Sequence, residues 1–323
     1  MIPIVSAALA FAVLAGHAAP AVAEDYPARP LRIVVPYPAG GTSDILARSI
    51  GQKLGESLGQ PIVVENKPGA NGNVGADLVA KAPPDGYTLL LADIGALAIS
   101  PSVYPTLPFD PTKDFAPVTM VAYSPHILVV HPAVAASSVK ELIALAKAKP
   151  GKLNFAISGV GGAPHLAGVD FALRTGIDWA YIPYKGGSQA IADVAGGQAD
   201  VTMNGMLATY PLVQGGKLKL LAVSSARRMG AIPDVPTLAE SGLAGFESGS
   251  WQGVVAPAGT PRNVVARLNA EITRIVNSPE MRDNLGKQGA DVRTNTPDEF
   301  AAFIRGEKMK WAKVVKDANV KID

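Results

Sequence analysis

An α/β fold divided into two domains is what this sequence predicts, on three observations. From residue 31 onward, short β-branched runs alternate with longer amphipathic segments, the pattern of βαβ units around a mostly parallel sheet. The chain has 323 residues, more than one hydrophobic core usually supports, so we expect two domains. Hydrophobic residues make up 48% of it and charged residues 17%, a composition that fills a core and differs from that of disordered chains.

The first 23 residues (1–23) are expected to be a signal peptide that is removed on export. Residues 4–16 form an uncharged apolar run, and a small-x-small pattern at residues 21–23 precedes an acidic pair. The run is shorter than the about 20 residues that a membrane-spanning helix needs. We therefore expect a mature protein that begins at Glu24 and is free in the compartment it reaches.

Strands are expected where aliphatic and β-branched residues cluster between turn residues, at 31–36, 61–65, 87–92, 127–130, 153–158, 179–183, 200–203 and 218–224. Helices are expected between them, the clearest after residue 41, where apolar residues recur at spacings of three and four up to Leu58. The C-terminal stretches 261–277 and 297–320 are also expected to be helical. Capping boxes that predict further helix starts pair Ser138 with Glu141, Thr237 with Glu240, and Thr296 with Glu299.

Charge and residue usage exclude several classes of function. The formal net charge is only +2 and no basic run is interleaved with aromatics, so nucleic-acid binding is not expected. The absence of cysteine excludes disulfides, thiolate nucleophiles and a lipid anchor. His126, His131 and His165 lack metal-ligand spacing, so we expect neither a metal nor a cofactor. We interpret His126 and His131 as the polar ends of a buried strand.

Three loops rich in glycine and hydroxyl groups follow predicted strands and precede predicted helices. They are the first loop (residues 36–44), the second loop (158–166) and the third loop (184–188). Ligands bind at this edge of a parallel sheet, where helix N-termini present free N–H groups. A phosphate-binding loop is one rival interpretation of the first loop, although no Lys follows its glycines, and a simple tight turn is another. The third loop only partly matches a nucleophile elbow, so catalysis by Ser188 is not expected.

Long segments of the chain resemble one known family. In chain order these segments are YPARPLRIVVPYPAGGTSDILAR, GQPIVVENKPGANGNVGADLVAKAPPDGYTLL, FDPTKDFAPVTMVA, SGVGGAPHL, IPYKGGSQAIADVAGGQAD, GKLKLLAVSS and PDVPTLAESGLAGFE. They are similar to the Bug family, also called the TctC family, of extracytoplasmic solute receptors of tripartite tricarboxylate transporters. The resemblance extends over essentially all of the mature chain.

The resemblance implies a periplasmic-binding-protein-like (type II) fold, in which two α/β domains enclose a ligand cleft. Domain 1 is expected at residues 24–124 and 249–323, and domain 2 at residues 125–248. The implied protein is periplasmic and not an enzyme. It captures a small carboxylate-bearing metabolite as a monomer and delivers it to the large and small membrane subunits of a transporter.

The resemblance further implies that the first and second loops hold a ligand carboxylate through backbone N–H groups, hydroxyls and bridging waters. Together with the third loop and two strand ends, the expected ligand-binding residues are Tyr37, Ala39, Gly40, Gly41, Thr42, Ser43, Asp44, Asp93, Ser158, Gly159, Gly161, Gly162, His165, Tyr184, Lys185, Gly186 and Asn204.

Two of these residues depart from the family pattern. Asp93 stands where a small or hydroxyl residue is usual, and Asn204 stands where an Asp is often found. We hypothesise that an ionised Asp93 opposes a second carboxylate on the ligand. The other interpretation is that Asp93 caps the segment after it or pairs with a Lys.

Two other functions remain open from the sequence. A sensory receptor that presents its ligand-bound form to a membrane kinase needs the same ligand-driven closure as a transport receptor. An enzyme on the same fold would need an acid or base, for which Asp44 and His165 are the only candidates. The identity of the ligand is not determined by the sequence.

Overall fold

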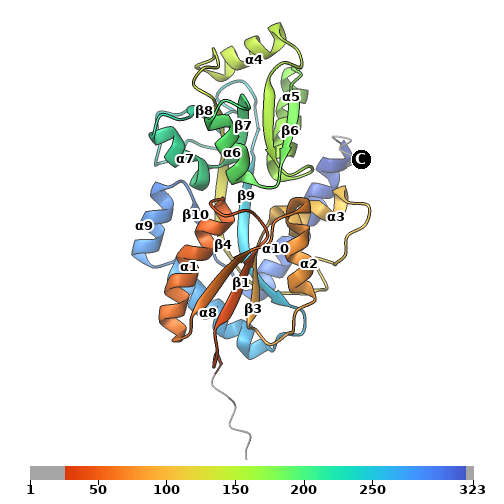
Figure 1. Ribbon diagram of the computed structural model, residues 1–323, viewed down its shortest axis with the longest axis vertical. Helices are drawn as coiled ribbons and strands as arrows, with labels where there is room; N and C mark the ends of the chain where they lie inside the picture. The colour runs from red at the N-terminus through yellow and green to blue at the C-terminus, as the bar shows by residue number, and fades with distance from the viewer. Residues whose placement is uncertain (1–25, 318–323) are drawn as a thin grey trace, which may run out of the picture.

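The computed structural model describes residues 26–317 as two α/β lobes joined end to end by long strands (Figure 1). The strand order is β2-β1-β3-β9-β4-β7-β5-β6, with β8 and β10 both paired to β4. We call residues 26–125 and 249–317 lobe 1, and residues 126–248 lobe 2. The expected signal peptide, residues 1–23, lies outside the described residues.

The first three strands of lobe 1 are parallel, as the sequence predicted. Strand β1 (Leu31–Val35) pairs in parallel with β2 (Ile62–Asn66) and with β3 (Thr88–Asp93). Helix α1 (Thr42–Leu58) connects the first two strands and buries Leu46, Ile50 and Leu54 against the sheet. The remaining short elements of this part are η1 (Ala70–Gly72), α2 (Asn73–Ala80), η2 (Gly95–Ile99) and α3 (Ser100–Val103).

Two long antiparallel strands lie where the lobes join, and the sequence predicted only residues 127–130 of them. Strand β4 (Phe115–Val130) pairs antiparallel with β9 (Gly249–Pro257) as far as Pro125. From His126 onward β4 pairs with strands of lobe 2 instead. Because β9 also pairs antiparallel with β3, the sheet is mixed. The expectation of a mostly parallel sheet is confirmed only for the βαβ part of each lobe.

Lobe 2 repeats the βαβ arrangement, with β5 lying in parallel between β6 and β7. Its elements in chain order are α4 (Val139–Ala148), β5 (Asn154–Ser158), α5 (Ala163–Thr175), β6 (Ala180–Tyr184), α6 (Gly187–Ala195), β7 (Val201–Gly205), α7 (Met206–Gln214) and β8 (Lys219–Val223). Most of its apolar side chains form two cores of their own, while Ala163, Leu166 and Leu207 pack into the cores of lobe 1.

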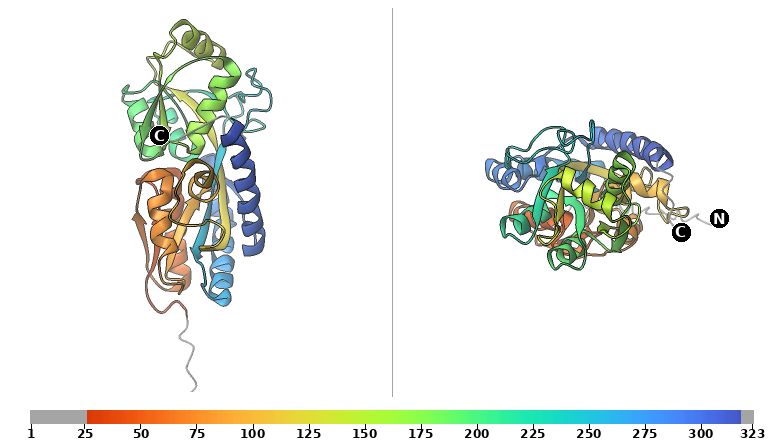
Figure 2. Two further views of the ribbon diagram at one scale, coloured as in Figure 1. Left: turned by 90° about the vertical axis from the view of Figure 1, so that its right-hand side faces the viewer. Right: turned by 90° about the horizontal axis from the view of Figure 1, so that it is seen from above.

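The chain ends in lobe 1 with α8 (Arg262–Val276), α9 (Pro279–Lys287), β10 (Asp291–Val292) and α10 (Pro297–Asp317). Helix α10 packs along η2, α3 and β4, and Figure 2 shows it running beside the long strands toward lobe 2. The indole of Trp251 in β9 donates a hydrogen bond to Glu307 of this helix. Over residues 26–317, no helix has the length and apolar character needed to cross a membrane.

Two of the three predicted capping boxes start helices. Ser138 accepts from the Glu141 N–H at the start of α4, and Thr296 exchanges both bonds with Glu299 before α10. Thr237 and Glu240 also form reciprocal hydrogen bonds, but only a turn follows, so the predicted helix start there is wrong. Gly242 and Gly245 take positive φ angles a few residues later, which ends the turn before a helix can propagate.

Candidate ligand-binding site

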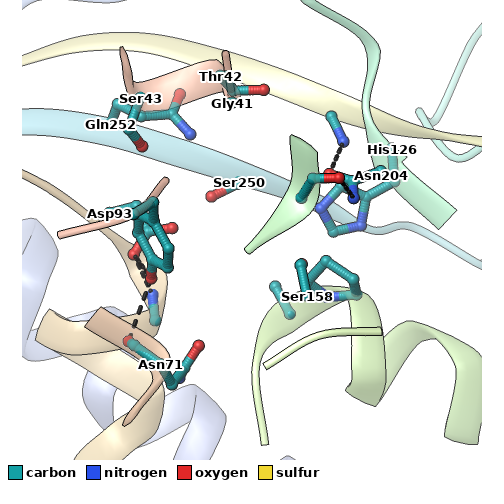
Figure 3. A pocket seen from close by; sticks show the side chains of 16 residues that line it. Gly41, Thr42, Ser43, Asn71, Asp93, His126, Ser158, Asn204, Ser250 and Gln252 are labelled. Carbon is teal, nitrogen blue, oxygen red and sulfur yellow. Dashed lines mark hydrogen bonds between the residues drawn. The ribbon is translucent and has the colours of Figure 1, made fainter. Parts of the chain in front are cut away.

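A pocket lies between the lobes at the ends of several strands. The empty space there, open solvent included, is about 520 Å³. Figure 3 shows its polar side chains pointing inward from both lobes. The lining residues are Tyr37, Gly41, Thr42, Ser43, Asn71, Asp93, Gly95, His126, Ser158, Ala163, Pro164, Gly187, Asn204, Gly205, Ser250 and Gln252.

The first residues of four helices meet at this pocket. Lining residues lie at the N-termini of α1, α5 and α6, and Gly205 is the residue before α7. In the described helices α1, α5 and α6 no side chain caps the first turn, whereas in α7 the Leu207 N–H donates to the Ser124 hydroxyl at 3.4 Å. Free N–H groups and the positive ends of the helix dipoles therefore face the cavity, and this arrangement favours an anion. Among residues 26–317, no Lys or Arg lines the pocket, so the N–H and hydroxyl groups would supply the attraction.

The first loop is held in shape by Asp44. This buried carboxylate accepts from the Gly40 N–H at 2.9 Å and from Asn66 at 2.9 Å, and it forms an ion pair with Arg48. Burial alone would raise the pKa of Asp44, but these hydrogen bonds outweigh it and hold the pKa below its usual value. Asp44 does not line the pocket, and the side chains of Thr42 and Ser43 do. Its observed role is to fix the loop that presents them.

The second loop is folded by His165. The Gly161 N–H donates to Nδ1 of His165 at 3.0 Å, and the imidazole ring packs edge-on against Tyr181. Burial lowers the pKa of His165, which keeps the ring neutral and able to accept this bond. Ser158, the last residue of β5, lines the pocket, while His165 does not.

Several predicted glycines of lobe 2 meet lobe 1. A Cβ placed on Gly161 would lie 2.4 Å from Cγ1 of Val103, and one on Gly162 would lie 2.8 Å from Oδ1 of Asn71. A Cβ on Gly186 would lie 2.3 Å from Cδ of Pro38. These separations are shorter than any side chain tolerates, so glycine at these positions allows the two lobes to touch.

The third loop contributes little to the pocket itself. The Tyr184 hydroxyl donates to Asp193 at 2.7 Å, and burial together with this carboxylate raises the pKa of Tyr184 to about 12. Lys185 is exposed on the surface. Of the predicted binding residues, those that do not line the pocket are Ala39, Gly40, Asp44, Gly159, Gly161, Gly162, His165, Tyr184, Lys185 and Gly186.

Asp93 is the last residue of β3 and lines the pocket. Its Oδ1 accepts from the Tyr37 hydroxyl at 2.7 Å and from the Gly95 N–H at 2.9 Å. Burial raises the pKa of Asp93 to about 6, although these two hydrogen bonds act in the opposite direction. Ser250 lies close enough to Asp93 to favour the charged form of its carboxylate. The Oγ of Ser250 nevertheless has no hydrogen-bond partner among the described residues.

The sequence interpretation missed several lining residues that come from the long strands. His126 lies inside β4, and burial lowers its pKa to about 3, so the ring is neutral. Its Nδ1 lies 2.8 Å from the Ser248 hydroxyl. The interpretation of His126 as a polar strand end is therefore wrong, because β4 continues past it in both directions. Ser250 and Gln252 alternate on β9, and this two-residue spacing of polar groups was the available signal.

Comparisons with known proteins show the family to which the chain belongs. A family model described as the tripartite tricarboxylate transporter family receptor matches residues 46–320. The BugT protein of Bordetella pertussis is 40% identical over 313 residues, which cover 97% of this chain and 96% of the relative.

Two solved structures with bound ligands are similar to the chain as well. The structure of R. palustris Rpa4515 with adipate has a TM-score of 0.90 at 36% identity, and the match covers 92% of this chain and 99% of that one. The structure of MatC from Rhodopseudomonas palustris with bound malate has a TM-score of 0.85 at 32% identity, and the match covers 90% of this chain and 100% of that one.

Proposed function

Since the chain belongs to the tripartite tricarboxylate transporter family of receptors, we propose that it captures a small carboxylate between its lobes for delivery to a membrane transporter. The observation that carries this proposal is the meeting of three uncapped helix N-termini, those of α1, α5 and α6, at one pocket. Such N-termini attract an anion without a side-chain cation. The adipate and malate of the two similar structures are anions of this kind.

The ligand carboxylate is proposed to sit where the starts of α1 and α5 face each other. Thr42, Ser43 and Ser158 all line this part of the pocket and offer hydroxyl donors. A carboxylate accepts several such bonds, and hydrogen bonds to a charged group contribute about 1.5–3 kcal/mol each. The glycines and His165 of the second loop then act indirectly, by shaping the loop around Ser158.

The lobes are proposed to act as two domains that close on the ligand, with domain 1 at residues 24–124 and 249–323 and domain 2 at 125–248. This proposal is supported by the change of strand partner in β4, where pairing with β9 stops at Pro125 and pairing with β7 starts at His126. The chain crosses between the lobes twice, at residues 125–126 within β4 and at residues 248–249 just before β9. Small φ and ψ changes at these two crossings would rotate one lobe as a body, and the crossings thereby form a hinge.

The proposed setting is the periplasm, reached by means of the N-terminal segment 1–23, and the proposed partners are the large and small membrane subunits of a transporter. The protein is proposed to act as a monomer and without catalysis. The titratable groups of the pocket support this last point. Asp93 is engaged by Tyr37 and Gly95, and neutral His126 has Ser248 as its neighbour.

Mass spectrometry of the exported protein under native conditions tests the proposed function. We expect a retained carboxylate whose release lowers the melting temperature, because a ligand that binds only the folded state stabilises it by mass action. Intact mass of the same sample should correspond to a chain starting at Glu24. A purified protein that binds none of a panel of mono- and dicarboxylates in calorimetry would contradict the proposal.

A further inference from the structure

Three polar side chains form a patch on one wall of the pocket. Asp93 in β3 and Gln252 in β9 are direct cross-strand partners. Ser250 lies two residues before Gln252 and so projects from the same face of β9. All three line the pocket, and we call them the Asp93 patch.

The Asp93 patch contains hydrogen-bonding atoms that the protein does not satisfy. Gln252 is 1% exposed and Ser250 is 9% exposed. In the described part of the chain, neither Oε1 of Gln252 nor Oγ of Ser250 has a hydrogen-bond partner. A buried polar atom without a partner costs about 1–3 kcal/mol. Two such atoms beside a carboxylate therefore indicate a surface built for a bound group.

The chemistry of the patch is mainly that of an acceptor. The Gln252 oxygen can only accept, its amide nitrogen can only donate, and the Ser250 hydroxyl can accept or donate. Oδ1 of Asp93 already receives two protein donors, which leaves Oδ2 as a further acceptor. Figure 3 places Asp93 and Asn71 on one side of the pocket and Ser158 with Asn204 on the other, with Ser250 between them. Asp93 thus lies on the side of the pocket opposite to Ser158, and Ser250 lies between them.

The charge of the pocket is also uneven. Helix N-termini compensate a carboxylate near Ser158, whereas no Lys or Arg among residues 26–317 lines the pocket to compensate a second one. The titratable groups that face Asp93 are Tyr37 and, across the pocket, His126, which is neutral. A second ligand carboxylate beside Asp93 would therefore meet a like charge in a partly desolvated site.

Building on the proposed function, we propose that the Asp93 patch selects a ligand whose far end carries a hydrogen-bond donor. The ligand class is a carboxylate with an ammonium or amide nitrogen at its other end. An ammonium group has three donors for Asp93, Gln252 and Ser250, and a primary amide donates to two of them while its oxygen can accept from the Ser250 hydroxyl. Either group removes the like-charge contact. Selection arises because the wrong ligand leaves buried acceptors without a donor.

Calorimetry at pH 8 with matched ligands tests this selection. The six-carbon set is adipate, its monoamide and 6-aminohexanoate, and the four-carbon set is succinate, succinamate and 4-aminobutanoate. We expect the nitrogen ligands of at least one set to bind about tenfold or more tightly than the dicarboxylate, since about 1.4 kcal/mol gives that ratio. Asp93→Asn should bring the dicarboxylate to within about threefold of the amide, because the substitution removes the like charge.

Two further variants separate this inference from the proposed function. Gln252→Leu removes an acceptor without changing charge and should weaken the amide more than the dicarboxylate. Ser158→Ala should weaken all ligands of a set by a similar factor, because it acts on their common end. The inference would be overturned if the wild type bound the dicarboxylate as tightly as the nitrogen ligands, or if Asp93→Asn ranked the ligands of a set in the same order as the wild type. Either result would leave the proposed function intact. Absence of any carboxylate binding would overturn both.

Discussion

Gly186→Ala tests whether contact between the lobes is part of ligand capture. Gly186 precedes α6 in lobe 2, and its φ of 177° is extended backbone that alanine adopts without strain. The three atoms nearest to an added Cβ all belong to Pro38 of lobe 1, the closest at 2.3 Å. The substitution therefore opposes only the state in which the lobes touch.

The expected increase in Kd follows from the 2.3 Å separation between the added Cβ and Cδ of Pro38. Carbon atoms pack at about 3.5–4.0 Å, so Pro38 must retreat by more than about 1 Å. Overpacking of this kind costs about 1–3 kcal/mol. Since binding is proposed to require the closed state, the same free energy appears in the dissociation constant, and Kd should rise by about 5- to 150-fold.

Calorimetry with the retained carboxylate measures this change, and small-angle scattering with and without ligand follows closure. The melting temperature of the ligand-free protein should stay close to that of the wild type, because opening the lobes relieves the clash. Gly230→Ala is the matched control, since Gly230 is exposed and no atom lies within 4 Å of its added Cβ. An unchanged Kd for Gly186→Ala would refute closure through this contact.

Three further outcomes are expected. Ser158→Ala should weaken carboxylate binding by about tenfold or more in calorimetry, as loss of one hydrogen bond to a charged group costs about 1.5–3 kcal/mol; equal affinity would remove Ser158 from the site. Asp44→Asn should lower the free energy of unfolding by about 1–3 kcal/mol at pH 7 in urea titrations, because it disrupts the bonds to Gly40 and Arg48. The difference should vanish as pH falls through the depressed pKa of Asp44. Asp93→Asn should stabilise the protein by up to about 3 kcal/mol at pH 8, since the pKa of Asp93 is raised to about 6 and its charged form is therefore disfavoured by folding. This gain should decline below pH 6 and be absent near pH 4, and a pH-independent difference would show that its charge is not the cause.

The local elements of this protein were predictable because their signals lie close together in the chain. The apolar spacing that predicted α1 reappears as the buried face of Leu46, Ile50 and Leu54. The glycine-rich loops lie at strand ends as expected. Glycine is the residue that most readily takes a positive φ, as Gly40 and Gly159 do, so its presence in the sequence indicates a turn.

The long strands were not predictable by the same means. β9 carries Gly249, Ser250, Gln252 and Gly253 in a segment that is buried along its whole length. Both of its faces are covered, because Val254 and Ala256 belong to one hydrophobic core and Trp251 and Val255 to another. Apart from the two-residue spacing of Ser250 and Gln252, no amphipathic alternation therefore marks it. The antiparallel pairing that makes the sheet mixed is for the same reason absent from the sequence pattern.

The sequence by itself determined the two-domain α/β class, the family resemblance and the position of the glycine-rich loops at strand ends, because each depends on neighbouring residues. Only the tertiary structure decided how those loop residues divide their roles. Asp44 and His165 turn inward to hold their own loops, whereas Gly161 and Gly186 face the opposite lobe. Asn71, His126, Ser250 and Gln252 complete the pocket from distant parts of the chain. Side-chain direction and contact between remote segments arise from packing of the whole fold, and no local pattern encodes them.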